Sequence, residues 1–157
     1  MKKVKSVTSH FIVLLSAILT ITSCKTTSAV ADKITIESGE IPPDMKTEKF
    51  ILIGTLKDKR SYDKYVEKEF DAYTGEYVLA TKEEISTKYP DKSKYRYIMD
   101  CVEVRSPSGN GKDYTTGFRY YIRDRKTGTN YTRKGQSSFF ALEMKAYLKA
   151  IEAVRKQ

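Results

Sequence analysis

The amino-terminal stretch MKKVKSVTSHFIVLLSAILTITSC constrains the rest of the chain more than any other feature. It opens with three lysines within five residues and continues with an apolar run over residues 11–21. A basic start, a short apolar core and small residues after it are typical of a secretory signal peptide. The run has 11 residues, whereas a membrane-spanning helix needs roughly 20. We therefore expect residues 1–23 to be removed, and length disfavours an uncleaved membrane anchor.

The last four residues of this leader, Ile21-Thr22-Ser23-Cys24, resemble a lipobox, the motif at which bacterial lipoprotein precursors are lipidated on cysteine and then cut before it. The resemblance implies that Cys24 is the lipidation site and that acyl chains hold the mature protein on a membrane. Two or three chains anchor a protein stably, because each buried methylene contributes about 0.8 kcal/mol. Ala29-Val30-Ala31 offers an ordinary cleavage site slightly later. Under that alternative, Cys24 has no such role.

The residues after Cys24 bear on the membrane to which such a protein is sent. In many lipoproteins an aspartate directly after the lipidated cysteine retains the protein in the inner membrane, and here that position is Lys25. The resemblance therefore implies the outer membrane of the cell envelope, on its periplasmic side because no acidic cluster follows Cys24. Residues 24–33 are small and polar, so we expect a tether, followed by a single domain over residues 34–157.

Removal of the leader also restricts the chemistry of the 134 residues that remain. His10 is the only histidine, so the mature chain has neither an imidazole base nor a histidine-dependent nucleophile. With Cys24 acylated, Cys101 is the only thiol left, and its strand-like surroundings predict a buried, inert side chain. We expect three acids, the adjacent Glu83 and Glu84 and the turn residue Asp124, to cap a helix or turn or to lie solvated at the surface. We predict no catalytic residue, no metal site and no cofactor.

Charge favours a soluble, exported domain. The leader holds three of the 29 basic residues and none of the 20 acidic ones, which leaves a moderately basic mature chain. Acidic and basic residues occur together in every short stretch of the mature chain, as in Lys57-Asp58-Lys59-Arg60. Such mixing is typical of a solvated surface. Attraction to an anionic partner is the alternative. The export signal argues against nucleic acid as that partner.

Hydrophobic periodicity predicts alternating strands and helices. The continuous apolar run over residues 50–56 indicates a strand buried on both faces. Apolar spacings of three and four after Ser61, the expected N-cap, predict a helix, and Thr81 with Glu84 predicts a capping box at the start of a second, short helix. The other expected elements are strands over 33–37, 76–80, 95–105, 118–123 and 130–133, a loop over 106–113, and a long helix from residue 140 to the carboxyl end.

This order predicts an α+β domain, a two- or three-layer sandwich with a mixed or mainly antiparallel sheet and a long carboxy-terminal helix. Over residues 50–155 the element order resembles that of small periplasmic lipoprotein domains related to the TolB amino-terminal domain, the curli-secretion lipoprotein and penicillin-binding-protein activators. The resemblance rests on element order alone, so it implies a fold and no function.

Tyrosine is the one enriched residue type, with 12 copies that all follow the leader. Alternation along residues 118–123 places Arg119, Tyr121 and Arg123 on one outward face, and both residue types are frequent in binding hot spots. The alternative is ordinary strand propensity with side chains lying over the surface. We predict a lipid-anchored, non-enzymatic adaptor with an envelope protein as partner. A lipoprotein that binds a glycan or an anionic polymer on the Tyr/Arg face is the second hypothesis.

Overall fold

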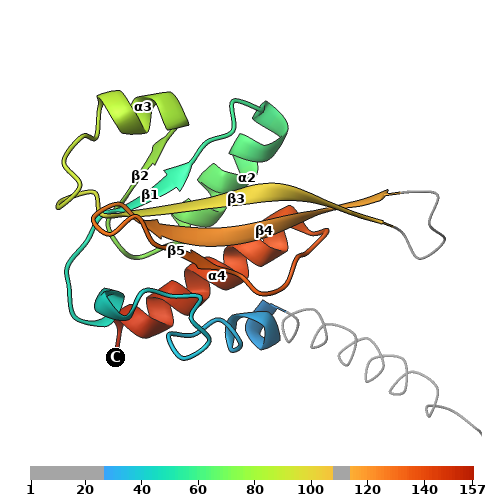
Figure 1. Ribbon diagram of the computed structural model, residues 1–157, viewed down its shortest axis with the longest axis horizontal. Helices are drawn as coiled ribbons and strands as arrows, with labels where there is room; N and C mark the ends of the chain where they lie inside the picture. The colour runs from blue at the N-terminus through green and yellow to red at the C-terminus, as the bar shows by residue number, and fades with distance from the viewer. Residues whose placement is uncertain (1–26, 108–113) are drawn as a thin grey trace, which may run out of the picture.

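The computed structural model describes residues 27–107 and 114–157, so the leader, Cys24 and the tip of the loop expected over 106–113 lie outside the described residues (Figure 1). A five-stranded mixed sheet has the order β2-β1-β3-β4-β5. Strand β1 pairs in parallel with β2 and β3, while β3, β4 and β5 pair antiparallel. The α+β class with a mixed sheet and a long carboxy-terminal helix is confirmed. The strands are β1 (Leu52–Thr55), β2 (Tyr77–Ala80), β3 (Tyr97–Pro107), β4 (Tyr114–Asp124) and β5 (Asn130–Thr132), and the helices are η1 (Pro43–Lys46), α2 (Arg60–Asp71), α3 (Lys82–Thr87) and α4 (Phe140–Arg155).

Strand β1 is buried on both faces, as its continuous apolar run predicts, and all four of its residues are inaccessible. Leu52 belongs to the main core, whereas Ile53 packs on the other side of the sheet with Ile85 of α3. Gly54 allows α2 to come close, because a Cβ at this position would lie 2.6 Å from the ring carbon Cζ of Phe70. The run therefore predicted a strand that is covered by helices on both sides.

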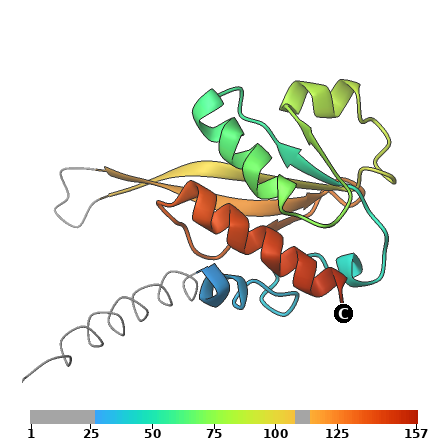
Figure 2. The ribbon, with the colours of Figure 1, turned by 180° about the vertical axis from the view of Figure 1, so that it is seen from behind.

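Helices α2 and α4 cover one face of the sheet (Figure 2), and the main core lies beneath them. The buried residues of α4 recur every three or four positions and include Met144, Tyr147, Leu148 and Ile151. Each such side chain contributes about 1.5–3 kcal/mol when it leaves water. Helix α3 covers the opposite face over β1 and β2, and Ile98 at the start of β3 packs against the smaller core that it builds. Beyond this start, β3, β4 and β5 carry no helix on that second face among the described residues (Figure 1).

The helix starts agree with the sequence in one case and differ in another. At α3 the predicted capping box is present: the Thr81 hydroxyl accepts from the Glu84 N–H, and the Glu84 carboxylate accepts from the Thr81 N–H. Helix α2 begins one residue before Ser61, and its N-cap is Lys59 without a side-chain cap. The Asp63 carboxylate accepts hydrogen bonds from the N–H groups of Lys57 and Lys59 instead. The Ser61 prediction was therefore wrong, because the helix begins at Arg60 and Ser61 lies inside its first turn, while Asp63 binds the backbone that leads into the helix.

The strand predicted over residues 33–37 is absent, and a series of turns takes its place. The Thr35 and Ser38 hydroxyls exchange hydrogen bonds with each other's backbone N–H groups at 3.0 Å, a local pattern that competes with strand pairing. Residues 27–31 form a short helix, and Ala31 and Ile34 belong to the main core. From residue 27 onward the expected tether is therefore part of the packed domain.

Candidate functional site

The uncovered second face of β3, β4 and β5 contains all three residues that the sequence suggested for binding. Strand register places Tyr121 opposite Asp100 and Arg119 opposite Val102, and Arg123 lies two residues further along β4 on the same side. Paired residues of antiparallel strands share a face. We call this surface the open sheet face. It consists of Asp100, Val102, Val104, Arg119, Tyr121, Arg123 and Thr132.

At the centre of the open sheet face lies Asp100, a carboxylate that is buried and fully hydrogen-bonded. Its oxygens accept from the Lys57 ammonium, from the Cys101 N–H at 2.7 Å and from the Tyr121 hydroxyl at 2.9 Å. The Lys57 ammonium also donates to the Cys101 carbonyl at 2.6 Å, and the Lys82 ammonium lies 3.9 Å from Asp100. Burial, followed by the Asp100 charge, raises the pKa of Tyr121. The Tyr121 hydroxyl is therefore protonated, and its hydrogen bond to Asp100 holds the ring in one orientation.

The two arginines of the open sheet face are not neutralised in this way. Neither Arg119 nor Arg123 forms an ion pair with a residue that the structure describes, and the Nε of Arg119 is buried without a hydrogen-bond partner. Between them and β1, Val102 is 46% exposed. A guanidinium has five donors in a planar fork and binds carboxylates or phosphates with two hydrogen bonds. The face therefore offers an apolar contact opposite one available cation, Arg119, with a second cation, Arg123, four residues further along β4.

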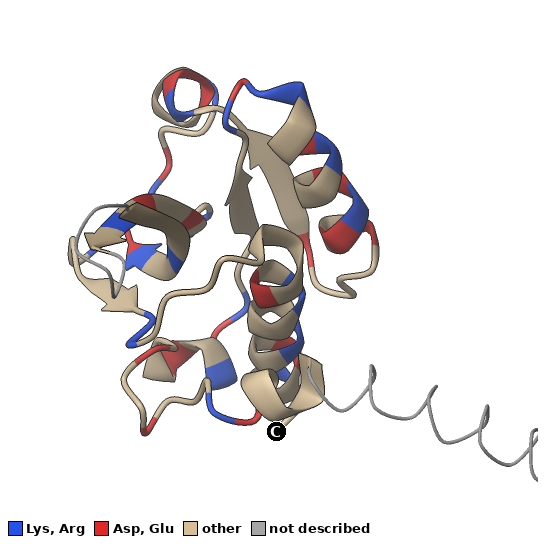
Figure 3. Cartoon of the chain, turned by 90° about the vertical axis from the view of Figure 1, so that its right-hand side faces the viewer, with Lys and Arg blue, Asp and Glu red and all other residues tan. Residues whose placement is uncertain are grey.

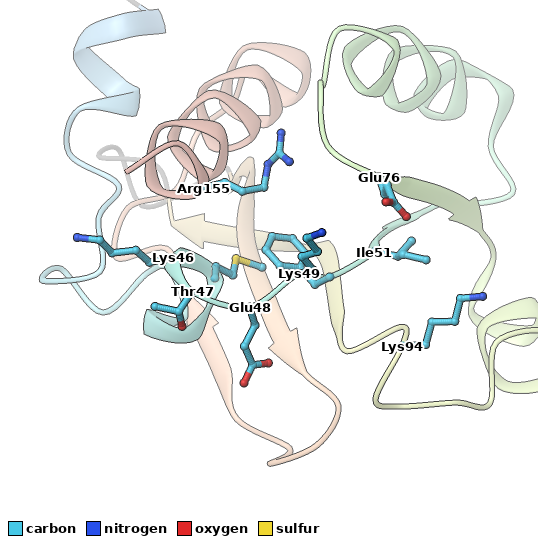
Figure 4. Close-up of a pocket in the computed structure, with 10 residues that line it drawn as sticks. Lys46, Thr47, Glu48, Lys49, Ile51, Glu76, Lys94 and Arg155 are labelled. Carbon is cyan, nitrogen blue, oxygen red and sulfur yellow. The ribbon is translucent and has the colours of Figure 1, made fainter.

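A second surface feature is a groove of about 600 Å³ at the amino-terminal ends of the parallel strands. Figure 4 shows Lys49 between Arg155 and Glu76, while the side chains of Lys46 and Glu48 extend away from that centre. Phe50 and Ile51 contribute apolar surface to its wall. Six charged residues line the groove: Lys46, Glu48, Lys49, Glu76, Lys94 and Arg155.

One wall of this groove is positioned by a buried arginine. Arg96 donates to both carboxylate oxygens of Asp124, at 3.1 and 2.7 Å, and to Asp44 and Glu48 at 2.6 Å each. Burial alone raises the pKa of Asp124, but hydrogen bonds from Arg96 and from the Lys126 N–H outweigh it and hold this pKa below its ordinary value. Asp124 therefore shapes the turn, as predicted, and in addition joins η1 to the end of β4.

A further ion cluster ties the amino-terminal segment to the other end of the domain. Arg133 lies 2.8 Å from the Glu143 carboxylate and 3.1 Å from that of Glu40, which also accepts from the Lys134 N–H. The Tyr147 hydroxyl donates to the Glu40 carbonyl at 2.6 Å. Both glutamates are buried. No sequence signal pointed to this cluster, because 93 residues separate Glu40 from Arg133.

The sequence also led to predictions about the two cysteines, about metal binding and about a membrane span. Cys101 is buried, as predicted, and burial raises its pKa to about 11. Cys24 lies outside the described residues. Within residues 27–107 and 114–157, no group of three or more His, Cys, Asp or Glu side chains could hold a metal ion. In the same ranges, no helix has the length and hydropathy that a membrane crossing requires.

Acidic and basic residues are interspersed along the helices and loops of the domain, as the mixed charge pattern of the sequence predicts (Figure 3). No family model matches the chain, and no curated protein matches it. Among solved structures, the dodecamer of a point variant of PelC from Paraburkholderia phytofirmans is similar, with a TM-score of 0.35 and 12% identity. The match covers 71% of this chain and 91% of the other. A TM-score of this size does not establish a shared fold.

Proposed function

We propose that this chain is a lipid-anchored, non-enzymatic protein of the bacterial envelope that acts as an adaptor, with a partner protein bound on the open sheet face. The observation that carries the proposal is the presence on this face of an ordered aromatic side chain, Tyr121, beside two arginines that have no acidic partner among the described residues. A side chain that is already ordered loses little entropy when it binds. Tyr and Arg are also the residue types that dominate binding hot spots.

The shape and charge of the open sheet face favour a macromolecular partner with acidic groups. The face is the surface of three paired strands, and Val102 projects from it, so a ligand would lie across it. Carboxylates on the partner would pair with Arg119 and Arg123, and an apolar side chain would cover Val102. Pairs of this kind mainly speed association and select the partner, while the apolar contact supplies affinity.

A glycan or another anionic polymer is the second candidate for the same face. Arg119, Tyr121 and Arg123 follow one another at every second residue of β4. Two residues of a strand span about 6.7 Å, so the row places its two guanidinium groups about 13 Å apart along β4, with an aromatic ring between them. A polymer with regularly spaced acidic groups could occupy the whole row, which is the observation that favours it.

Partner capture from solubilised envelopes tests the proposal. The wild-type chain is compared with the double variant Arg119→Glu and Arg123→Glu, and with a control of equal charge, Lys68→Glu and Lys92→Glu, at exposed positions away from the face. We expect a stoichiometric protein partner that the control retains and the double variant loses. Retention on purified cell-wall polymer without a protein partner would favour the second candidate. Equal capture by both variants would contradict a role for this face.

The anchor is tested separately. Cys24→Ala is expected to abolish labelling by a radioactive fatty acid and to release the protein into the soluble fraction. Three residues lie between Cys24 and residue 28, where the Lys149 ammonium contacts Ser28 at 2.8 Å. Since each residue spans at most about 3.6 Å, the lipidated domain would remain close to its membrane. Continued labelling of the Cys24→Ala variant would contradict the lipobox interpretation.

A further inference from the structure

The groove at the amino-terminal ends of the parallel strands is lined by more basic than acidic residues. Four of its six charged lining residues are basic. Lys49, Lys46 and Lys94 form no ion pair with any residue of the described ranges. The groove thus differs from the clusters around Arg96 and Arg133, in which acids outnumber the cation.

The two acids of the groove leave this excess in place. Glu48 is engaged by Arg96 at 2.6 Å and extends away from the centre of the groove (Figure 4). Glu76 remains, opposite Lys49 and Arg155 in the same view. One carboxylate among several cations lowers the positive potential without reversing it, and it can also accept a hydrogen bond from a neutral ligand group.

Arg155 is the preorganised member of the set. Its guanidinium lies over the Tyr73 ring at 5.6 Å, and its Nη2 donates to the Thr74 hydroxyl at 3.1 Å. Its Nε is buried without a hydrogen-bond partner. A guanidinium has five N–H donors, so Arg155 has further donors to offer an oxyanion in the groove that it lines. Lys49 reaches toward the same centre from the segment that precedes β1 (Figure 4).

We propose that this groove is a binding site for a small ligand with an oxyanion group, a carboxylate or a phosphate, held by Arg155 and Lys49. The volume of about 600 Å³ falls within the range of ligand pockets. Phe50 and Ile51 provide an apolar wall for the uncharged part of the ligand, and Glu76 accepts from a hydroxyl or amino group on it. The site lies apart from the open sheet face, so the two proposals stand or fall separately.

Calorimetric titration of the full chain in detergent at low ionic strength tests the site. The probes are inorganic phosphate and glucuronate, with glucose as the uncharged control. Lys49→Gln and Arg155→Gln are each expected to weaken binding about tenfold, since each removes a charge-assisted hydrogen bond. Lys46→Gln removes the same charge from a side chain that extends away, and it is expected to change the dissociation constant less than about twofold.

The outcomes separate the two oxyanion chemistries. Binding of phosphate alone assigns a phosphate-bearing ligand, and binding of glucuronate alone assigns a carboxylate-bearing one. In either case, Lys49→Gln must weaken the binding of that probe. If neither probe binds, or if Lys46→Gln weakens binding as much as Lys49→Gln, the proposal is overturned. Because Lys49 lies exposed outside the helices and strands, its variant tests the site even if Arg155→Gln fails to fold.

Discussion

Removal of the Asp124 charge should destabilise the domain and loosen one wall of the groove. In the Asp124→Asn variant the side chain keeps its size but can accept only one of the two hydrogen bonds from Arg96. Arg96 is buried and then depends on Asp44 and Glu48, whose side chains are 44% and 48% exposed. The guanidinium thus loses its only buried counter-charge and keeps two partly hydrated ones.

The structure sets the size of this effect. Breaking a buried ion pair typically costs about 3–5 kcal/mol. Because two carboxylates remain 2.6 Å from Arg96, we expect a smaller loss of about 2–3 kcal/mol for Asp124→Asn. Arg96→Met should cost more, about 3–5 kcal/mol, because it leaves Asp124 charged and 1% exposed without any cation. The order of the two variants is therefore part of the prediction.

Urea denaturation followed by far-ultraviolet circular dichroism measures both free energies of unfolding, since the chain has no tryptophan to report by fluorescence. The pH dependence gives a second test. The pKa of Asp124 is lowered in the folded protein, so its contribution is complete above the ordinary aspartate pKa and disappears as the pH falls through the folded value. The wild type and Asp124→Asn should differ most near neutrality and converge in acid.

Two results would refute this reasoning. The first is a loss below about 0.5 kcal/mol for Asp124→Asn at neutral pH, which is the size expected of an exposed pair. The second is a difference between wild type and variant that stays constant down to acidic pH, because the charge of Asp124 would then not be its cause. Equal m-values in the two proteins are the control that both unfold from comparable states.

Three further predictions concern packing, hydrogen bonding and reactivity. Gly54→Ala should destabilise by about 1–3 kcal/mol, measured by thermal unfolding, because its Cβ would lie 2.6 Å from Phe70 and 2.7 Å from Leu79; an unchanged melting temperature would contradict this close packing. Tyr147→Phe should cost about 1–2 kcal/mol in urea, because the Glu40 carbonyl loses its donor; a neutral effect would mean that Tyr147 contributes packing alone. Cys101 should resist a thiol reagent near neutral pH until the protein unfolds, because it is buried and its pKa is about 11, and rapid labelling of the native protein would refute that.

Much of the fold could be predicted from short-range patterns. The run over residues 50–56 became β1, the Thr81–Glu84 box starts α3, and the apolar positions of the last helix became its buried stripe. Such patterns depend on residues within one or two turns, so they survive without knowledge of the partner surface. The strand predicted over 33–37 failed because local hydroxyl bonds of Thr35 and Ser38 compete with pairing.

The candidate site could be predicted only in part. Alternation along β4 placed Arg119, Tyr121 and Arg123 on one face, and the structure agrees. Their partners could not be inferred, because Asp100 reaches Tyr121 only through the β3–β4 register, and Lys57 reaches Asp100 across 43 residues of sequence. The alternation indicated that the β4 part of this face points outward, but it could not show which strands the helices would cover.

Local residue patterns specified most of the individual helices and strands and, for a chain cut before Cys24, the absence of histidine. Which charges are neutralised depends instead on the tertiary structure. Arg96 and Arg133 find acids 52 and 93 residues away, while Arg119 and Lys49 find none among the described residues. The spacing at which side chains recur on one face of a helix or strand is a local property of the backbone. The counter-charge of a side chain depends instead on how distant segments meet in space. The packing of distant segments therefore decides which cations are neutralised within the protein and which have no acidic partner among the described residues.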